Sequence, residues 1–299
     1  MDSPNIWSSS ELATRYAKEL DIDIVPFLRN DKITLTRNPQ TGVMMFDGCI
    51  PGDGRFYEQL SKRSYYYMAD KWEFRESIDQ LADEPKDSRI LEIGCGSGAF
   101  LDACRDASFT NVQGVEFNEK AIRECREKGH SVRNIDLASL AEAGEQFDHI
   151  FAFQVLEHVP DPDVFMKTAA TLLSPGGTLV FTTPNRESFL QRFQWQLLDL
   201  PPHHMSRWDK QSYETLTSHM GLELRDVRFE PLAKYHYRFY TSSMVQHLPE
   251  RSIRRRLAKV ACRIGFAMYP MKQSIQGHTI MAIITPPSPT IASQTRRAA

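Results

Sequence analysis

From residue 89 onward, short apolar segments alternate with segments of helical periodicity, and this alternation constrains the fold more than any other feature. The apolar segments have almost no polar interruption, which is typical of strands buried on both faces of a parallel sheet. We therefore predict a doubly wound α/β fold in which helices cover both sides of a mostly parallel sheet. The predicted strands span residues 89–93, 112–117, 147–155, 178–183, 222–229 and 279–285, and the predicted helices span residues 100–107, 119–128, 164–173 and 210–220.

The first of these strands runs into three glycines at alternate positions, Gly94, Gly96 and Gly98. Glycine lets the backbone turn sharply and lets a ligand lie against the main chain. Glu116 ends the next strand, about 20 residues beyond the glycines, where a carboxylate can accept hydrogen bonds from ribose hydroxyls. Strand, glycine loop, helix and acid together predict a nucleoside-containing cofactor, whereas the alternative is a tight turn that binds nothing.

The spacing of the glycines separates two classes of cofactor. Dinucleotide sites favour Gly-x-Gly-x-x-Gly, because a pyrophosphate must sit on the helix N-terminus. Here the loop reads Gly-x-Gly-x-Gly and continues with Ala99 and Phe100. The spacing therefore favours a nucleoside without a pyrophosphate over a nicotinamide dinucleotide.

Several segments, in this order and at this spacing, resemble the motifs of class I S-adenosylmethionine-dependent methyltransferases. Residues 90–101 resemble motif I, and residues 114–117 resemble motif II. Residues 134–137 look like the acidic segment that contacts adenine, residues 147–159 like the strand-four motif and residues 172–177 like the turn before strand five. The resemblance implies a Rossmann-like fold with a seven-stranded, mostly parallel sheet, and S-adenosyl-L-methionine as the cofactor.

The resemblance also implies which residues bind this cofactor. The glycine loop would bind its methionine and adenosyl parts, and Glu116 its ribose. Asp136 and Leu137 would contact the adenine, and Gln154 would line the pocket. The full set of expected cofactor-binding residues is Glu92, Gly94, Cys95, Gly96, Gly98, Glu116, Phe117, Asp136, Leu137 and Gln154.

Two pairs of residues are candidates for proton removal from an oxygen acceptor. Histidine, with a pKa near neutrality, is the usual general base, and open α/β sheets place their ligands at the carboxyl ends of strands. Glu157-His158 follows a predicted strand, and His203-His204 lies in the segment 200–208. We expect His158 or His204 to be catalytic, with a rate that rises through a histidine-like pKa. The alternative is that these side chains only shape the loops beside the pocket.

The segment 200–208 resembles a loop of ubiquinone-type and saccharide-type methyltransferases. In ubiquinone O-methyltransferases the strand-four motif reads Glu-x-x-Glu-His and is linked to a divalent metal. Gln154 stands here in place of the first acid, so one anionic ligand is missing and no metal is assigned.

Residues 1–70 are expected to form an N-terminal accessory segment, with strands at 32–36 and 43–46. Part of it weakly resembles the zinc-ribbon-like leader of some saccharide-modifying methyltransferases, but only Cys49 remains of the paired cysteines. We expect a metal-free segment that packs over the acceptor pocket, with its aromatic residues in a core. The methyltransferase domain would span residues 71–286, starting with a helix near 70–81, and residues 287–299 would form a disordered tail.

A basic helical insertion is expected at residues 231–277. Residues 251–276 contain no Asp or Glu, and apolar residues recur at helical spacing opposite most of the basic ones. We interpret this as a helix packed on the domain with a solvated basic face. The alternative is peripheral contact of residues 251–272 with a membrane or with an anionic, lipid-linked acceptor.

The composition argues against several partners, covalent links and locations. A formal net charge of -2 gives no electrostatic reason to expect nucleic acid as a partner. The five cysteines are scattered and never spaced as Cys-x-x-Cys, which argues against disulfides and a structural zinc site. No secretory signal or apolar run of membrane-spanning length is visible, so a cytoplasmic location is expected.

We therefore expect a transferase that O-methylates a small-molecule or saccharide-like acceptor. A quinone or lipid-linked acceptor is the first alternative, and a non-catalytic cofactor-binding module is the second. The sequence carries no signal for oligomeric state.

Overall fold

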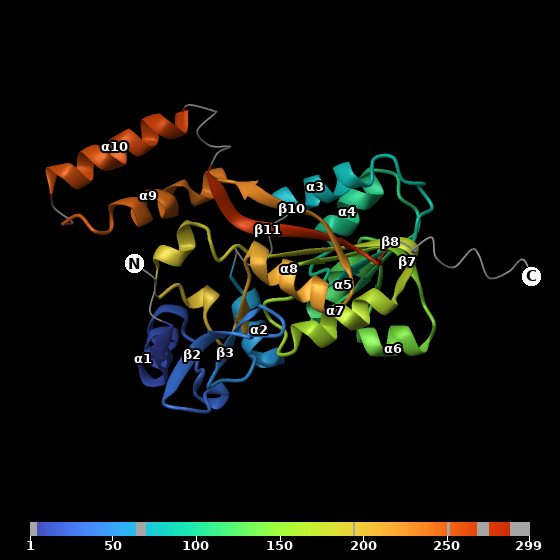
Figure 1. The fold of residues 1–299 in the computed structure, drawn as a ribbon, viewed down its shortest axis with the longest axis horizontal. Coiled ribbons are helices and arrows are strands. Elements are labelled where there is room, and N and C mark those ends of the chain that lie inside the picture. Colours follow the sequence, from blue (N-terminus) through green and yellow to red (C-terminus); the bar gives the residue numbers. More distant parts are fainter. Residues whose placement is uncertain (1–4, 64–69, 194, 250–251, 268–274, 288–299) are drawn as a thin grey trace, which may run out of the picture.

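A computed structural model describes residues 5–63, 70–193, 195–249, 252–267 and 275–287. Its main element is a seven-stranded sheet with the order β10-β11-β8-β7-β4-β5-β6 (Figure 1). Strands β4 to β8 are parallel, and β11 pairs antiparallel with both β8 and β10. The strands are β4 (Ile90–Ile93), β5 (Val112–Val115), β6 (Ser131–Arg133), β7 (Phe147–Phe153), β8 (Leu173–Pro184), β10 (Glu223–Pro231) and β11 (Gln276–Thr285). The predicted seven-stranded, mostly parallel sheet is confirmed.

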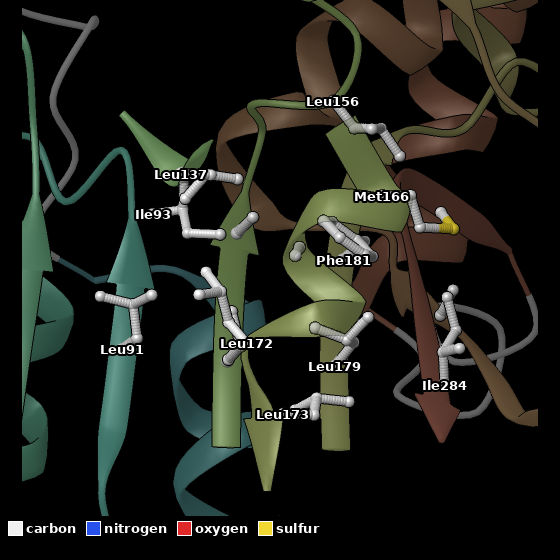
Figure 2. Close-up of a cluster of buried hydrophobic side chains, with 14 of the residues drawn as sticks. Leu91, Ile93, Leu137, Leu156, Met166, Leu172, Leu173, Leu179, Phe181 and Ile284 are labelled. Atoms are coloured by element: carbon white, nitrogen blue, oxygen red, sulfur yellow. The ribbon is translucent and has the colours of Figure 1, made fainter. Parts of the chain in front are cut away.

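Helices cover both faces of this sheet, as the doubly wound prediction requires. On one face, α6 (Leu137–Glu142), α7 (Pro162–Thr171) and α8 (Lys210–His219) bury side chains in the largest core cluster. Figure 2 shows part of this cluster, in which Phe181 of β8 lies near Met166 of α7, whereas Leu91 and Ile93 of β4 lie on the other side of the view. On the other face, α3 (Trp72–Gln80) and α4 (Ala99–Asp106) pack on β7, and α5 (Glu119–Glu127) packs beside α4. Six of the seven residues of β7 are buried, with Asp148 as the exception, and its sequence is mostly apolar.

The N-terminal segment forms a second, smaller layer with its own core. Its strands β1 (Ile6–Ser8), β2 (Lys32–Arg37) and β3 (Met44–Asp47) pair antiparallel, and β9 (Ser206–Arg207) completes the sheet from far along the chain. A helix α1 (Ser9–Arg15), which continues as a π-helical turn (Tyr16–Leu20), and α2 (Gly54–Ser61) cover this sheet. Trp7, Phe46 and Phe56 are buried in the core between them, as expected for the aromatic residues.

The insertion after β10 forms α9 (Tyr237–Val245) and α10 (Ile253–Ala267), and α10 lies beside α9 at the periphery, upper left in Figure 1. Four apolar side chains on one side of α10 are exposed: Ile253 73%, Leu257 64%, Val260 50% and Ile264 61%. The expectation that this face packs on the domain is therefore wrong, because no described element covers it. Residues 250–251 and 268–274 of the expected insertion and residues 288–299 of the expected tail lie outside the described residues.

Three short 3₁₀ turns complete the connections near the sheet edge: Val25–Phe27, Phe189–Arg192 and Leu197–Asp199, and a fourth, Lys234–His236, leads into α9. Among the described helices, none has both the length and the apolar character needed to cross a membrane.

Candidate functional site

A cavity of about 1670 Å³ opens at the carboxyl ends of the parallel strands. One part is lined by the loop after β4, by the residues that follow β5 and by the end of β7. Another part is lined by α2 of the N-terminal layer, by the segment 195–204 and by the start of α9. The cavity is therefore closed by elements from both layers of the molecule.

The glycine loop turns in the left-handed region of backbone space. Gly94 has φ 73° and Gly98, at the N-terminus of α4, has φ 81°, a conformation that favours glycine. A Cβ at Gly94 would lie 2.7 Å from a methyl carbon of Val155, so a side chain there would also collide with the segment after β7. Glycine at these positions is therefore required by the backbone conformation and by close packing against neighbouring side chains.

The Glu116 side chain connects this loop to the end of β5 through hydrogen bonds. Its Oε2 atom accepts a hydrogen bond from the backbone N–H of Gly96 at 2.9 Å. Its Oε1 atom accepts hydrogen bonds from the N–H groups of Phe117 and Asn118, both at 2.8 Å. A carboxylate offers about four lone-pair sites. These three bonds therefore leave acceptor capacity at a residue that lines the cavity.

Most of the other expected cofactor-binding residues also line the cavity. Glu92 and Cys95 are buried there, and burial raises the pKa of the Glu92 carboxyl well above its usual value. Phe117 lies at the cavity with an exposed side chain. Gln154 adopts a positive φ of 56° and donates to Thr182 through its main chain at 2.9 Å. The side-chain amide of Gln154 lies 3.4 Å from the Thr182 hydroxyl.

Three expected residues do not line the cavity: Gly98, Asp136 and Leu137. Asp136 caps α6 by accepting a hydrogen bond from Ser139 N–H at 2.7 Å. Leu137 is buried in the largest core cluster. A contact of these two residues with an adenine stays a prediction from the resemblance.

Two segments meet on the other side of the cavity, and each brings histidines. The main-chain carbonyl of Glu157, after β7, accepts hydrogen bonds from the N–H groups of Met205 at 2.7 Å and Ser206 at 3.2 Å. This pairing places the rings of His158, His203 and His204 against one another, with centroid separations of 4.5 to 4.9 Å. The structure thus brings together the two histidine pairs that the sequence singles out.

Burial controls the charge of these groups. Burial lowers the pKa of His158 to about 4 and holds the pKa values of His203 and His204 well below the usual histidine range. Burial raises the pKa of the neighbouring Glu157 carboxyl to about 8. The imidazoles are therefore neutral at pH 7, and a rate that rises through an ordinary histidine pKa is no longer expected.

The chain matches known proteins over the region that carries the glycine loop, Glu116 and the histidine cluster. Residues 63–227, more than half of the chain, match the family described as a methyltransferase domain. The chain belongs to the S-adenosylmethionine-dependent methyltransferase family. The ubiquinone biosynthesis O-methyltransferase of Bordetella avium is 31% identical to this methyltransferase over 177 residues, which are 53% of this chain and 73% of the relative. The protein of the same name from Thiobacillus denitrificans is 32% identical over 180 residues, or 54% of this chain and 76% of that one.

A solved methyltransferase supports the fold alone. The crystal structure of a SAM-dependent methyltransferase from Archaeoglobus fulgidus superposes on this methyltransferase with a TM-score of 0.52 and 18% identity. The superposition covers 76% of this chain and 99% of that chain.

S-adenosylmethionine is the cofactor of this methyltransferase, and the residues of the cavity fit it. Gly94, Gly96 and Ser97 line the cavity, so a ligand held there can lie against the main chain of the glycine loop. Glu116 keeps acceptor capacity for ribose hydroxyls after binding the loop.

Several cavity residues of the methyltransferase were not predicted from the sequence. The hydroxyl of Tyr57 lies 3.4 Å from His158 Nδ1 and 3.3 Å from the His203 carbonyl oxygen. Tyr57 belongs to the aromatic-rich segment that was expected to form core. Asp199 and His278 also line the cavity, and neither lies in a motif that could have pointed to it.

Proposed function

We propose that this methyltransferase transfers a methyl group to a hydroxyl oxygen of a small, ring-containing and lipid-like acceptor, such as a quinone-type phenol. The observation that carries the proposal is the single cavity that joins the glycine loop and Glu116 to the histidine cluster. Two reactants held in one cavity react at a much higher effective concentration than in solution. The cavity is also large enough to hold a nucleoside cofactor and a second small molecule.

The chain's own residues divide the work between binding and proton removal. When bound, the cofactor supplies an electrophilic methyl group on a sulfonium sulfur. We assign the binding and orientation of its amino-acid and ribose parts to the glycine loop and Glu116. On the acceptor side, the neutral imidazoles of His158 and His204 offer nitrogen lone pairs that can accept the hydroxyl proton.

The acceptor class follows from the lining of the cavity. Tyr57, Trp195, Tyr235 and Phe239 surround the acceptor side, and aromatic rings pack well against a planar acceptor. Tyr235 and Phe239 are also half exposed, 50% and 44%, so the lining continues outward to the surface. The relatives named as ubiquinone biosynthesis O-methyltransferases support an acceptor of quinone type.

The exposed face of α10 supports a lipid-like acceptor in a second way. Ile253, Leu257 and Ile264 form an apolar row, and exposed Arg254 and Arg256 lie at its two sides. A helix of this kind binds an anionic membrane surface with its apolar face in the headgroup region. Because α10 packs beside α9, which carries Phe239, membrane contact would bring the cavity close to a lipid-soluble acceptor.

The decisive experiment is methyl transfer from labelled S-adenosylmethionine to two sets of acceptors: hydroxylated quinone precursors with isoprenoid tails, and saccharides. We expect label in the quinone-type phenols. Label in saccharides alone would support the saccharide-like acceptor expected from the sequence. Cofactor binding without label in any acceptor, including those of a cell extract, would support a non-catalytic module.

A further inference from the structure

Three histidines converge on one point in the acceptor side of the cavity. One ring nitrogen from each of His158, His203 and His204 lies within 4.8 Å of the others. His158 follows β7, whereas His203 and His204 follow the turn Leu197–Asp199, so the cluster joins two separate segments. His203 and His204 are buried and His158 is partly buried. Buried imidazoles that meet from separate segments are the common nitrogen ligands of transition metals.

Hydrogen bonds orient the rings of His158 and His204. His158 Nδ1 lies 2.7 Å from the main-chain carbonyl oxygen of His203, and His204 Nδ1 lies 3.3 Å from Asp199 Oδ1. Each acceptor selects the tautomer with its proton on Nδ1, which leaves the lone pair on Nε2. Metal-binding histidines show this arrangement, in which a carbonyl or carboxylate orients the ring from behind.

The buried side chain of Glu157, next to His158 in the sequence, provides a second and independent observation. Its carboxyl group is buried, and neither of its oxygens has a hydrogen-bond partner among the described residues. Its Oε1 atom lies 3.9 Å from His158 Nε2. A buried carboxyl group without a partner is unfavourable, and a cation held by the histidines would satisfy it.

We propose that His158, His203 and His204 bind one divalent transition-metal ion, with Zn²⁺ as the ion of matching chemistry. Three nitrogen donors favour Zn²⁺, Co²⁺ or Ni²⁺ over Mg²⁺, which prefers oxygen ligands. Zn–N bonds of about 2.1 Å require the ring nitrogens to approach more closely than 4.8 Å, which ring rotation can provide. Three protein ligands leave a coordination position open toward the cavity.

This donor set differs from the Glu-x-x-Glu-His motif linked to a metal in ubiquinone O-methyltransferases. Gln154 replaces the first acid of that motif, and its amide lies against Thr182. The donors that meet here are three ring nitrogens, so this site is nitrogen-rich where that motif offers mainly oxygens. In the metal-bound form the lone pairs of His158 and His204 would hold the ion, so an acceptor hydroxyl bound to the metal would release its proton to water instead of to these imidazoles. This role rests on the proposed function, whereas metal binding itself does not.

The test is calorimetric titration of the full chain with Zn²⁺ after chelator treatment, in the presence of S-adenosylhomocysteine. We expect one equivalent to bind, and Co²⁺ to give the absorption bands of a low-symmetry nitrogen site. His203→Gln and His204→Gln should each weaken binding by about 100-fold or more, and Asp199→Asn by about tenfold. His219→Gln, on the exposed end of α8, is the matched control and should bind as the wild type does.

Binding of S-adenosylhomocysteine by each variant shows that its fold is intact. Absence of stoichiometric Zn²⁺ and Co²⁺ binding would overturn the inference, as would unchanged affinity in folded His203→Gln and His204→Gln variants. Methylation of a phenol by chelated, metal-free protein would overturn the metal's role alone and leave the proposed function standing. Stoichiometric binding at the histidines in a protein that methylates no phenol would uphold the site and overturn the acceptor class.

Discussion

Glu116 Oε2 accepts a hydrogen bond from the backbone N–H of Gly96 at 2.9 Å, across the gap between the ends of β5 and β4. Through this bond the carboxylate that is expected to bind ribose also fixes the loop that is expected to bind the rest of the cofactor. The two halves of the proposed cofactor site are therefore coupled, and one substitution tests both.

Glu116→Ala should weaken S-adenosylmethionine binding by about tenfold or more. The change removes a charged acceptor worth roughly 1.5–3 kcal/mol and releases the N–H group of Gly96 in the loop and those of Phe117 and Asn118 after β5. The fold should survive, because the residue lies beyond the end of β5. Calorimetric titration with S-adenosylmethionine measures the effect.

Glu124→Ala is the matched control, since its side chain is exposed on α5 and pairs with Lys120 at the surface. An unchanged dissociation constant in Glu116→Ala would refute the ribose role. Binding of NAD in place of S-adenosylmethionine by the wild type would contradict the interpretation of the glycine spacing.

His158→Ala should lower turnover by about a hundredfold and leave cofactor affinity nearly unchanged. The reason is position: His158 lies in the histidine cluster on the acceptor side, whereas the glycine loop and Glu116 lie on the other side of the cavity. Single-turnover rates and S-adenosylmethionine titrations separate the two quantities. Normal turnover in His158→Ala, in His204→Ala and in the double variant would exclude both histidines from proton removal.

The local pattern predicts six of the seven strands, and the resemblance to the methyltransferase family supplies the number seven. Strand β7 is mostly apolar, as expected for a parallel strand covered on both faces. The three-residue strand β6 (Ser131–Arg133) was not predicted, because only Val132 is buried and so short a segment has no periodicity. The histidine cluster was partly predictable, since both pairs follow elements that end at the same edge of the sheet.

The remaining features depend on contacts between distant parts of the chain. Strand β9 is two residues long and pairs with Met44 and Met45, so nothing local marks it as part of the N-terminal sheet. The amphipathic pattern of α10 predicts an apolar face but not its environment, and the structure leaves that face exposed. A local pattern cannot decide between packing partners that the sequence does not identify.

Tyr16→Phe tests how the N-terminal layer supports the acceptor side. The buried Tyr16 hydroxyl donates to the carbonyl oxygens of Leu197 at 2.6 Å and Leu200 at 3.0 Å, just before His203. Removing the hydroxyl takes this donor away from the two buried carbonyl groups, so the free energy of unfolding should fall by about 1–2 kcal/mol. The KM for the acceptor should rise, while S-adenosylmethionine affinity stays unchanged.

Tyr213→Phe provides the comparison, because its hydroxyl is equally buried but lies 3.0 Å from Thr183 within the main core. It should lose similar stability in urea unfolding without a change in the KM for the acceptor. Equal KM values in both variants would show that the N-terminal layer does not position the segment 197–204.

Asp148→Asn should destabilise the protein more at pH 5 than at pH 3. Burial by itself raises the pKa of Asp148, but hydrogen bonds from Arg89 and Ser174 lower it to about 2. An unfolded aspartate has a pKa of about 3.9, so the unfolded state takes up the proton first as the pH falls. The stabilisation is complete above about pH 4 and is lost progressively as the pH falls toward 2.

Urea unfolding of both proteins at the two pH values measures the difference, with the exposed Asp87→Asn variant as the control. A destabilisation that is equal at both pH values would contradict the role assigned to the Arg89–Asp148 pair.

Binding to lipid vesicles tests the exposed face of α10. We expect binding that requires acidic headgroups and weakens with salt, because Arg254 and Arg256 beside the apolar row each contribute about 1 kcal/mol near an anionic surface. The double variant Arg254→Glu/Arg256→Glu should therefore lose binding. The double variant Ile253→Ser/Leu257→Ser should weaken it as well, since the apolar row is the part that enters the headgroup region.

Val164→Ser and Lys167→Glu on α7 are the matched controls, because they change an exposed apolar residue and an exposed charge on a different helix. Both should bind vesicles as the wild type does. If only the α10 variants lose vesicle binding and they still methylate a short-chain, water-soluble phenol, α10 acts in membrane binding and not in the chemistry of the cavity. Absence of vesicle binding at low salt would show that the apolar row meets something other than a lipid surface.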